Sequence, residues 1–402
     1  MQYISINDYD YNLPDEKIAK YPLFRRDESK LLVYKKGSIT DDIFSNLDQH
    51  LPQKSLLVYN DTRVIQARLL LQKKSGSQIE IFCLEPYQQD DYYSAFQQKG
   101  SCYWKCLIGN AKKWKEEYLK NEIQIGNNKV VIEAIKKEIN KEFSIIQFKW
   151  QPANYCFGEL LEHIGHMPIP PYLHRQSEEI DRTRYQTIYS SQKGSVAAPT
   201  AGLHFTPMIF EKLENKDILC RNLTLHVGAG TFLPVKETNA ALHKMHAEPF
   251  LIRKELINNI LDFSGNITST GTTSLRALES IYWMGVKLTE RIPDPFFLDQ
   301  WDAYTLPSHH TAELVLKVLL EHCDKVNAKE IVARTKLMIV PGYNFKIAKR
   351  LITNFHQPKS TLLMLVAAFA GNENWKKIYN HGLKNDYRFL SYGDSSLITK
   401  RD

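Results

Sequence analysis

The sequence predicts an α/β protein, in which a largely parallel sheet carries helices on both faces and is interrupted by an inserted all-β, barrel-like domain. Apolar strand patterns alternate with helical patterns toward both ends of the chain, which is typical of parallel sheets. Short β-rich runs separated by polar turns fill residues 65–152. Three glycine-containing loops follow apolar runs between residues 194 and 280, and open α/β sheets bind ligands in such loops.

These patterns divide the chain into three regions. We expect residues 1–64 to begin the α/β domain, residues 65–152 to form the β-barrel insert, and residues 153–402 to complete the α/β domain. A chain of 402 residues is long for a single core. Its first residues lack the basic and apolar parts of a secretory signal, and the longest apolar run, residues 361–371, is too short for a membrane span. We therefore expect a cytoplasmic protein with no membrane partner.

The sequence pattern of the first region, residues 1–64, predicts two helices and a strand. Residues 13–22 carry a proline suited to a first helical turn. Residues 40–51 place apolar side chains on one helical face and predict a second helix. Residues 55–64 form an apolar run that ends in a polar turn, which predicts a buried strand.

The insert predicts a small barrel or sandwich. Its expected strands are ARLLLQ, QIEIFCLEP, CYWKCLIGN, KVVIEAI and FSIIQFKW, and the tyrosine-rich YQQDDYYSAF is an expected loop. Residues 99–149 contain eleven lysines, six glutamates and no arginine or aspartate. This surplus favours either a solvated face or contact with a phosphate backbone.

The third region returns to alternating elements. Its expected strands are SVAAPTAG, NLTLHVGAG, ITST and EIVARTKLMIV, and its expected helices are GELLEHIGHMP, PMIFEKLEN, TTSLRALESIYWMG, HHTAELVLKVLLEHC and TLLMLVAAFAG. The last helix is apolar throughout and is expected to be buried. Thr206 and Ser360 precede helices and suit the capping position.

Neither cysteines nor histidines predict a metal site. The six cysteines fit no zinc motif and no dense disulfide framework, so reduced thiols are expected. The segment HKMHAE holds two histidines and a glutamate, but it lacks the i,i+4 spacing of helical zinc ligands.

Three loops carry the residues suited to chemistry. GSVAAPTAGLHFT contains Gly202 and His204, LHVGAGTF contains His226 and a glycine pair, and GTTSLRALES begins a helix with three hydroxyls. Glycine lets a ligand approach the backbone closely, and a helix N-terminus favours an anion. Each motif alone is also compatible with an ordinary turn, a capped helix or a structural histidine.

Taken together, these segments resemble the S-adenosylmethionine:tRNA ribosyltransferase-isomerase family of queuosine biosynthesis. The segments that carry the resemblance are YNLPDEKIAKYPLFRRDESKLLV, LLVYNDTRVIQARL, GELLEHIGHMPIPPY, RYQTIYS, GSVAAPTAGLHFT, LHVGAGTFLPV, KMHAE, GTTSLRALES, TNFHQPKSTLLMLVAAFAG and YRFLSYGDSSLI. They follow the family order along nearly the whole chain. Gln66, Ala247 and Gln357 depart from the usual pattern, and none of them removes an ionisable group.

The resemblance implies a reaction. The ribosyl part of S-adenosylmethionine is transferred to 7-aminomethyl-7-deazaguanine at the wobble position of a tRNA anticodon and isomerised. The product is epoxyqueuosine in tRNA, and adenine and methionine leave. S-adenosylmethionine is therefore a consumed cosubstrate, tRNA is the partner, and no metal is expected. We expect a monomer.

This chemistry suggests roles for residues. Proton removal beside the sulfonium needs a base, and adenine leaves more readily when an acid protonates it. We assign these proton transfers to His204 and His226, with Asp61 or Glu159 as alternative bases. The candidates for binding the cosubstrate lie in the glycine loops and the helix start: Gly202, Gly228, Gly230, Thr231, Thr272, Thr273 and Ser274.

Recognition of tRNA is expected to centre on a single-stranded anticodon loop, which proteins bind through splayed bases and phosphates. The candidate RNA-binding residues are cations beside the expected pocket: Arg25, Arg26, Arg63, Arg184 and Lys359. Two rival functions stay open. One is a tRNA methyltransferase that uses the same cosubstrate, supported by the glycine pair after the strand NLTLHV. The other is a non-catalytic RNA-binding paralogue.

Overall fold

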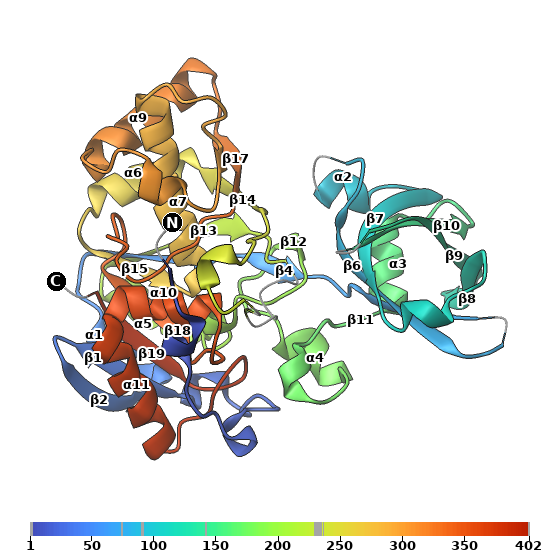
Figure 1. Ribbon diagram of the computed structural model, residues 1–402, viewed down its shortest axis with the longest axis horizontal. Coiled ribbons are helices and arrows are strands. Elements are labelled where there is room, and N and C mark those ends of the chain that lie inside the picture. Colours follow the sequence, from blue (N-terminus) through green and yellow to red (C-terminus); the bar gives the residue numbers. More distant parts are fainter. Residues whose placement is uncertain are drawn as a thin grey trace.

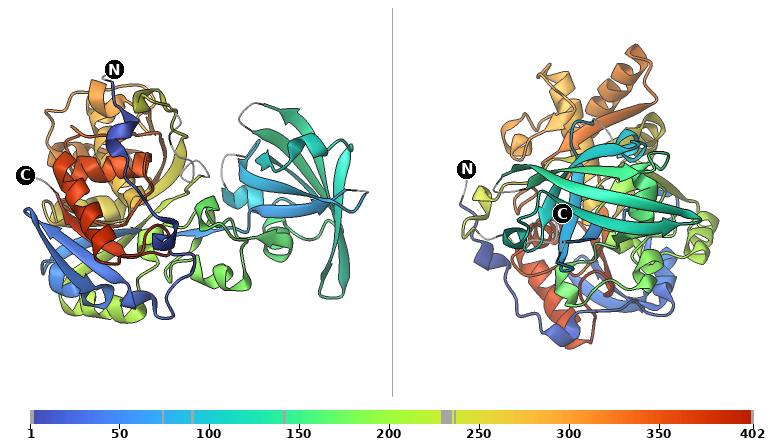
Figure 2. Two further views of the ribbon diagram at one scale, coloured as in Figure 1. Left: turned by 60° about the horizontal axis from the view of Figure 1, so that its bottom comes forward. Right: turned by 90° about the vertical axis from the view of Figure 1, so that its right-hand side faces the viewer.

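Two sheets organise the chain in this computed structural model, which describes residues 3–73, 75–89, 92–140, 143–228, 235 and 237–400. Figure 1 shows the larger sheet and its helices on one side of the molecule and a smaller barrel set apart from it. Figure 2 shows that a narrow neck joins the two parts.

The larger sheet has ten strands. In spatial order they are β16 (Phe297–Leu298), β17 (Glu330–Thr335), β14 (Glu248–Arg253), β13 (Ile218–Leu225), β3 (Ser55–Asn60), β15 (Ile267–Thr270), β18 (Arg350–Asn354), β19 (Ser395–Thr399), β1 (Lys30–Lys35) and β2 (Ser38–Ile43). The central strands β13, β3, β15 and β18 are parallel to one another. Antiparallel neighbours join them on both sides, at β14 and at β19. The predicted α/β class is confirmed.

Helices cover both faces of this sheet, because successive strand residues point to opposite sides. Leu56 and Val58 of β3 enter a core shared with α6, α7, α9, α10 and α11, whereas Leu57 enters a second core shared with α1 and α5. The helices of this domain are α1 (Leu47–His50), α5 (Pro207–Asn215), α6 (Lys254–Asp262), α7 (Thr272–Thr289), α8 (Asp302–Thr305), α9 (Ala312–Lys325), α10 (Thr361–Ala370) and α11 (Asn372–Lys384).

The buried helix α10 confirms its sequence prediction. The Ser360 side chain accepts a hydrogen bond from the Leu363 amide at 3.1 Å and so caps the helix. Residues 363–370, which make up most of this helix, are all buried. Among the described helices, none combines the length and apolarity needed to cross a membrane.

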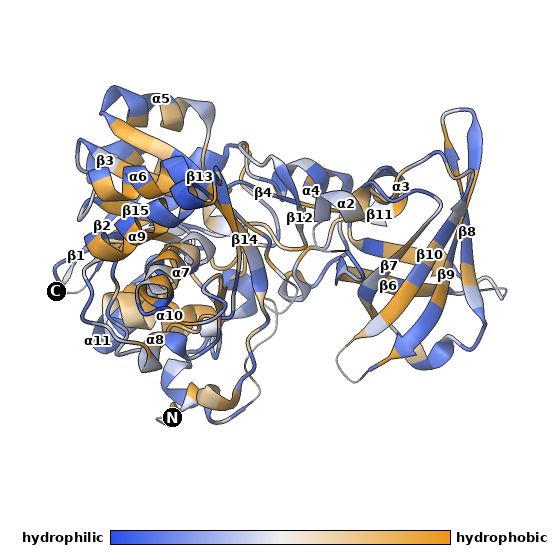
Figure 3. Cartoon of the chain, turned by 90° about the horizontal axis from the view of Figure 1, so that it is seen from above, coloured by the Kyte–Doolittle hydropathy of each residue, from blue (hydrophilic) through white to orange (hydrophobic). Residues whose placement is uncertain are grey.

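The smaller sheet closes into a barrel of antiparallel strands. Around the barrel they are β5 (Arg68–Gln72), β6 (Gln78–Pro86), β7 (Ser101–Ile108), β10 (Ser144–Gln151), β9 (Asn128–Ile139) and β8 (Tyr118–Ile125), and β8 pairs back with β5 through Gln72 and Lys120. Figure 3 shows hydrophobic and hydrophilic residues alternating along these strands, as expected when one face points into a core. The predicted β-barrel insert is confirmed.

Two short helices and a short strand complete the barrel. Phe157 and Leu160 of α3 (Phe157–Ile164) belong to the barrel core, as does Phe96 of α2 (Tyr92–Phe96). The strand β11 (Gly165–His166) pairs with β5. We therefore propose that the barrel unit extends to residue 166 rather than ending at residue 152.

The neck and the loops contain the remaining elements. The parallel pair β4 (Thr62–Val64) and β12 (Gln192–Ser195) lies in the neck, near α4 (Glu179–Arg184) (Figure 1). Single 3₁₀ turns occur at Ile6–Tyr9, Asp15–Lys17, Arg26–Glu28, Phe44–Asn46, Ala111–Lys113, Pro171–Leu173, Thr200–Gly202 and Ala240–Leu242.

Two predicted helices near the N-terminus are wrong in large part. Residues 40–43 belong to strand β2, which forms a hairpin with β1 through Lys36 and Gly37, both at positive φ. Such a turn is matched to the twist of paired strands, and pairing prevails over the local helical pattern. Within residues 13–22 only one 3₁₀ turn forms, because Ile18 pairs with Phe389.

Other elements also differ from the prediction. SVAAPTAG is mostly irregular, since strand β12 ends at Ser195 and Pro199 has no amide proton to donate. The expected loop YQQDDYYSAF contains helix α2, whose Ala95 and Phe96 are buried. The strand β8 has no counterpart among the predicted elements.

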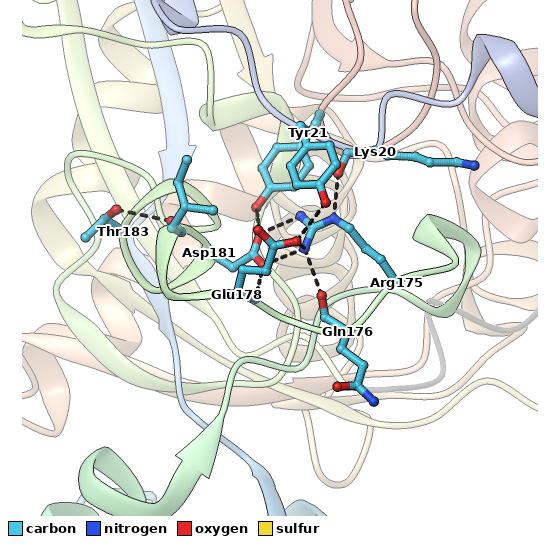
Figure 4. Close-up of polar contacts among 9 residues, drawn as sticks. Lys20, Tyr21, Arg175, Gln176, Glu178, Asp181 and Thr183 are labelled. Atoms are coloured by element: carbon cyan, nitrogen blue, oxygen red, sulfur yellow. Dashed lines mark hydrogen bonds and ion pairs between the residues drawn. The ribbon is translucent and has the colours of Figure 1, made fainter.

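A buried carboxylate ties three distant segments together beside the neck (Figure 4). Asp181 of α4 receives two hydrogen bonds from the Arg175 guanidinium, at 2.7 and 2.8 Å, and a third from the Tyr392 hydroxyl at 2.7 Å. Arg175 also donates to the Lys20 carbonyl at 2.9 Å and lies over the Tyr21 ring. Burial alone would raise the Asp181 pKa, but the bonds from Arg175, the Glu178 amide and Tyr392 keep it below 3.8.

We predict that Asp181→Ala lowers the free energy of unfolding by about 3–5 kcal/mol, because it leaves the Arg175 charge enclosed without its partner. Urea denaturation of both proteins measures this difference. The matched control is Glu179→Ala, which removes an exposed carboxylate paired with Arg182 at 3.2 Å. It should change stability by less than about 1 kcal/mol. Equal, small effects of the two substitutions would contradict the prediction.

Candidate active site

An open pocket lies where parallel strands of the large sheet end. Its empty volume is about 690 Å³, counted out to the mouth. Strand β15 leads into it at Gly271, β18 at Asn354 and β13 at Val227. The loop after β12 supplies residues 197–201. The described parts of all three glycine loops therefore meet at the carboxyl ends of the sheet strands, as the rule for open α/β sheets predicts.

The pocket wall is neutral. None of the described residues that line it is Asp, Glu, Lys or Arg. Its polar groups are hydroxyls, amides and one imidazole, from residues such as Tyr172, Thr353, Asn354 and His356. Alanines and Val227 supply apolar surface. Such a wall suits a flat or cationic organic ligand that needs a few directed hydrogen bonds.

The start of helix α7 forms one side of this pocket. Thr272 and Thr273 line it, and Gly271 precedes them at a φ of +88° that an L side chain adopts rarely. The hydroxyls of Thr273 and Ser274 are enclosed and have no hydrogen-bond partner among the described residues. Ser274 is fully buried and does not line the pocket. The first amides of this 18-residue helix have no intrahelical partners, and such amides favour an anion.

The predicted glycines have different surroundings. A Cβ on Gly202 would lie 2.0 Å from the Tyr189 hydroxyl, so Gly202 permits close packing and does not line the pocket. The Gly228 amide donates to Glu248 at 3.2 Å, next to Val227 in the pocket wall. Gly230 and Thr231 lie outside the described residues.

A buried ion pair behind this loop is absent from the sequence predictions. Arg276 of α7 pairs with Glu248, and both side chains are buried. Burial lowers the Arg276 pKa to about 10, so the guanidinium remains charged at neutral pH. The available signal was an arginine among the mostly apolar residues of a helix that is buried along most of its length. The pair joins α7 to the backbone at Gly228.

His204 is enclosed beside the pocket rather than exposed in it. Its Nδ1 lies 2.8 Å from the Ser29 hydroxyl, and its Nε2 lies 3.3 Å from the Asn354 amide nitrogen. Burial lowers its pKa to about 3, with a further contribution from the charge of Arg388. Both ring nitrogens are thus occupied, and the ring contacts Asn354 in the pocket wall.

His226 lies where the barrel meets the large domain. Its Nδ1 is 2.9 Å from the Thr62 hydroxyl, and its ring packs against Tyr92 of α2 and against Gly194. Burial lowers its pKa to about 4. Its Nε2 has no partner among the described residues, so a neutral ring there can accept a proton.

His356 is the imidazole that does line the pocket. Its Nε2 is 2.8 Å from the Thr353 hydroxyl, and its backbone amide donates to Tyr379 at 2.9 Å. Burial lowers its pKa to about 3. The sequence indicates this position as a histidine in a loop, in the segment NFHQPKS before a helix.

The two carboxylates named as alternative bases lie away from the pocket. Buried Asp61 accepts from Ser191 and Asn222 at Oδ2 and from Thr224 at Oδ1, and so joins β13 to the end of β3. Glu159 is exposed at the start of α3, where it accepts from the Cys156 amide at 2.7 Å in a capping box. The hydrogen bonds of these two carboxylates give each of them a structural role.

The predicted cations divide into two groups. Arg26 and Arg184 line a second, smaller pocket of about 290 Å³ that shares Ser391 with the first. The others lie elsewhere: Arg25 pairs with Glu28, Lys359 pairs with Asp10, and Arg63 is exposed on β4 in the neck.

Within the described ranges, one group of side chains has the spacing of a metal site. Glu290, His309 and His310 bring their ligand atoms within 4.8 Å of one another at the surface. They lie at the far end of α7, about 27 Å along the helix from its start in the pocket. The HKMHAE histidines do not join such a group, and Glu248 of that segment pairs with Arg276.

Comparison with known proteins gives consistent matches. A family model described as "Queuosine biosynthesis protein" matches residues 6–398. The S-adenosylmethionine:tRNA ribosyltransferase-isomerase of Halothermothrix orenii is 37% identical over 98% of this chain and 100% of the relative. The protein of the same name from Trichlorobacter lovleyi is 35% identical over 98% of this chain and 99% of the relative.

Among solved structures, the crystal structure of S-adenosylmethionine tRNA ribosyltransferase from Thermotoga maritima is 28% identical and covers 97% of this chain and 99% of that chain, with a TM-score of 0.46. The match of the family model over nearly the whole chain and the identity of the curated relatives decide the assignment. This chain belongs to the queuosine biosynthesis protein family, whose curated relatives here are enzymes named S-adenosylmethionine:tRNA ribosyltransferase-isomerase.

Proposed function

We propose that this enzyme transfers the ribosyl part of S-adenosylmethionine to 7-aminomethyl-7-deazaguanine at the wobble position of tRNA and isomerises it to epoxyqueuosine. A bond forms between the amine nitrogen and the ribosyl carbon, and adenine and methionine leave. The observation that carries the proposal is that the described parts of three family loops meet in one pocket at the strand ends, whose described lining has no charged side chain.

Different lining residues of the pocket suit different parts of the cosubstrate. The amides and hydroxyls of Thr272 and Thr273 at the α7 start suit the methionine carboxylate. Ala198 and Val227 offer apolar contact to the adenosine. The absence of Lys and Arg among the described lining residues means that no cation in this wall opposes the sulfonium.

The neutral histidines support proton transfer in different ways. His356 lines the pocket, and His226 keeps one ring nitrogen without a described partner, so we propose these two for proton transfer. His204 has both ring nitrogens occupied, so its proposed role is to position Asn354. We give Asp61 and Glu159 no proton-transfer role, because each has structural partners outside the pocket.

The decisive experiment incubates the protein with S-adenosylmethionine and tRNA that carries the deazaguanine precursor. We expect free adenine and methionine, and mass spectrometry of the anticodon nucleoside should find an epoxide-bearing cyclopentane derived from the ribose. A labelled methyl group in the tRNA would instead support the methyltransferase. RNA binding without breakdown of the cosubstrate would support the non-catalytic paralogue.

We predict that His356→Gln and His226→Gln each slow adenine release by about 100-fold or more, the usual contribution of a proton-transfer group. Binding of S-adenosylmethionine, measured by calorimetry, should change little. The matched control is His163→Gln on the exposed side of α3, which should release adenine at the parent rate. Near-normal rates for both folded variants would remove these two residues from the mechanism.

The pH dependence follows from the low pKa values of about 3 for His356 and about 4 for His226. A ring with a lowered pKa stays neutral, and able to accept a proton, until the pH falls to that value. We therefore expect the pH profile of the single-turnover rate to show no histidine step centred near 6.5, and a step from these rings only as the pH approaches 4. A drop centred near 6.5 would show that an ordinary histidine controls the rate.

A further inference from the structure

The second pocket has a different chemical character from the first. It is lined by Arg26, Arg184 and Arg388, from three segments far apart in the chain, and it adjoins the neutral pocket at Ser391. The Arg175–Asp181 cluster lies behind these segments: Tyr392, which donates to Asp181, is also in the wall of the second pocket.

The positive charge of this pocket is only partly compensated. Arg388 lies 3.5 Å from buried Asp394. Arg26 and Arg184 have no carboxylate within 4 Å among the described residues, and they donate to backbone carbonyls instead. The Arg184 Nε is enclosed without a partner. Burial lowers the pKa of Arg26, and the neighbouring Arg184 charge lowers it further. A bound anion would offset this charge and use the remaining guanidinium donors.

An exposed aromatic side chain directly follows Leu23, which lines this pocket. Phe24 is 96% exposed, although its backbone is held in place. Its carbonyl accepts a hydrogen bond from Arg184 at 3.1 Å, and the neighbouring Leu23 carbonyl accepts a second one at 2.6 Å. A phenyl ring almost wholly in water, on a fixed backbone beside arginines, provides a surface on which a nucleobase can stack.

We propose that this pocket and Phe24 bind the single-stranded anticodon loop: a phosphate occupies the arginine pocket and a neighbouring base stacks on Phe24. The proposal rests on the proposed function for its partner, tRNA. It adds Phe24 and Arg388 to the RNA-binding residues and places the strand next to the cosubstrate pocket, through Ser391.

The alternative occupant is the carboxylate of S-adenosylmethionine. Two observations favour RNA. The start of α7 already offers donors for a carboxylate within the neutral pocket. A small carboxylate would also leave Phe24 exposed and without a function, whereas a nucleotide strand uses both the guanidinium groups and the ring.

The test measures binding of a fluorescein-labelled anticodon stem-loop RNA by anisotropy, independently of catalysis. We expect Phe24→Ala to weaken binding by about tenfold, and Phe24→Trp to retain it, because stacking contributes about 1–3 kcal/mol per base. Arg26→Gln should weaken binding and reduce the slope of log K against log salt by about 0.7. The matched controls are Tyr3→Ala, an exposed aromatic elsewhere, and Arg182→Gln, an exposed arginine on α4. Both controls should bind like the parent.

Equilibrium dialysis with S-adenosylmethionine completes the test and should give unchanged binding for Phe24→Ala and Arg26→Gln. Unchanged RNA affinity in both variants would overturn the proposal, as would a loss of S-adenosylmethionine binding in Arg26→Gln with RNA affinity intact. These outcomes are distinct from failure of the proposed reaction. If the parent enzyme forms no epoxide but its RNA binding depends on Phe24 and Arg26, the proposed RNA site is supported and the proposed reaction is contradicted.

Discussion

The buried ion pair between Arg175 and Asp181 holds together the segments on which both pockets depend. Asp181 also receives the Tyr392 hydroxyl from the C-terminal loop, and Arg175 reaches the carbonyl of Lys20 in the N-terminal segment. A charge pair in this setting is strong only because every partner is present, since each charge left alone would be costly to bury. The cluster thus fixes loops that have little regular secondary structure, and those loops supply the walls of the arginine pocket and part of the neutral one.

A second carboxylate fixes the opposite side of the site. Asp61 directly follows strand β3 and accepts hydrogen bonds from β13 and from the segment before β12, so three chain segments leave the sheet in fixed directions. Glu248 and Arg276 then hold the backbone at Gly228 against α7. Charged residues therefore surround the neutral pocket but do not line its described wall. This arrangement places a rigid polar support behind a surface suited to a sulfonium nucleoside.

The two adjoining pockets differ in charge, and each suits a different one of the two proposed ligands. A cationic cosubstrate is best held by hydroxyls, helix amides and apolar groups, whereas a nucleic acid strand requires cations that offset its phosphates. Placing both in one open cleft would bring the guanidinium groups against the sulfonium. The two pockets meet at Ser391, so the proposed RNA strand would lie near the cosubstrate while each ligand had its own electrostatic surroundings.

The sequence by itself determined the α/β class, the barrel insert, long helices such as α7 and α10, and the family, because these depend on periodic patterns and local motifs. It also indicated which loops converge. It could not determine which way a side chain points: Val227 lines the pocket, whereas the preceding His226 faces Thr62 and Gly194. Glu248, Arg276 and Phe24 gain their proposed roles from partners tens to hundreds of residues away, and His356 from the distant segments that form the pocket with it. Those contacts, and the strand pairing that turned residues 40–43 from a predicted helix into β2, arise from tertiary packing that no local pattern encodes.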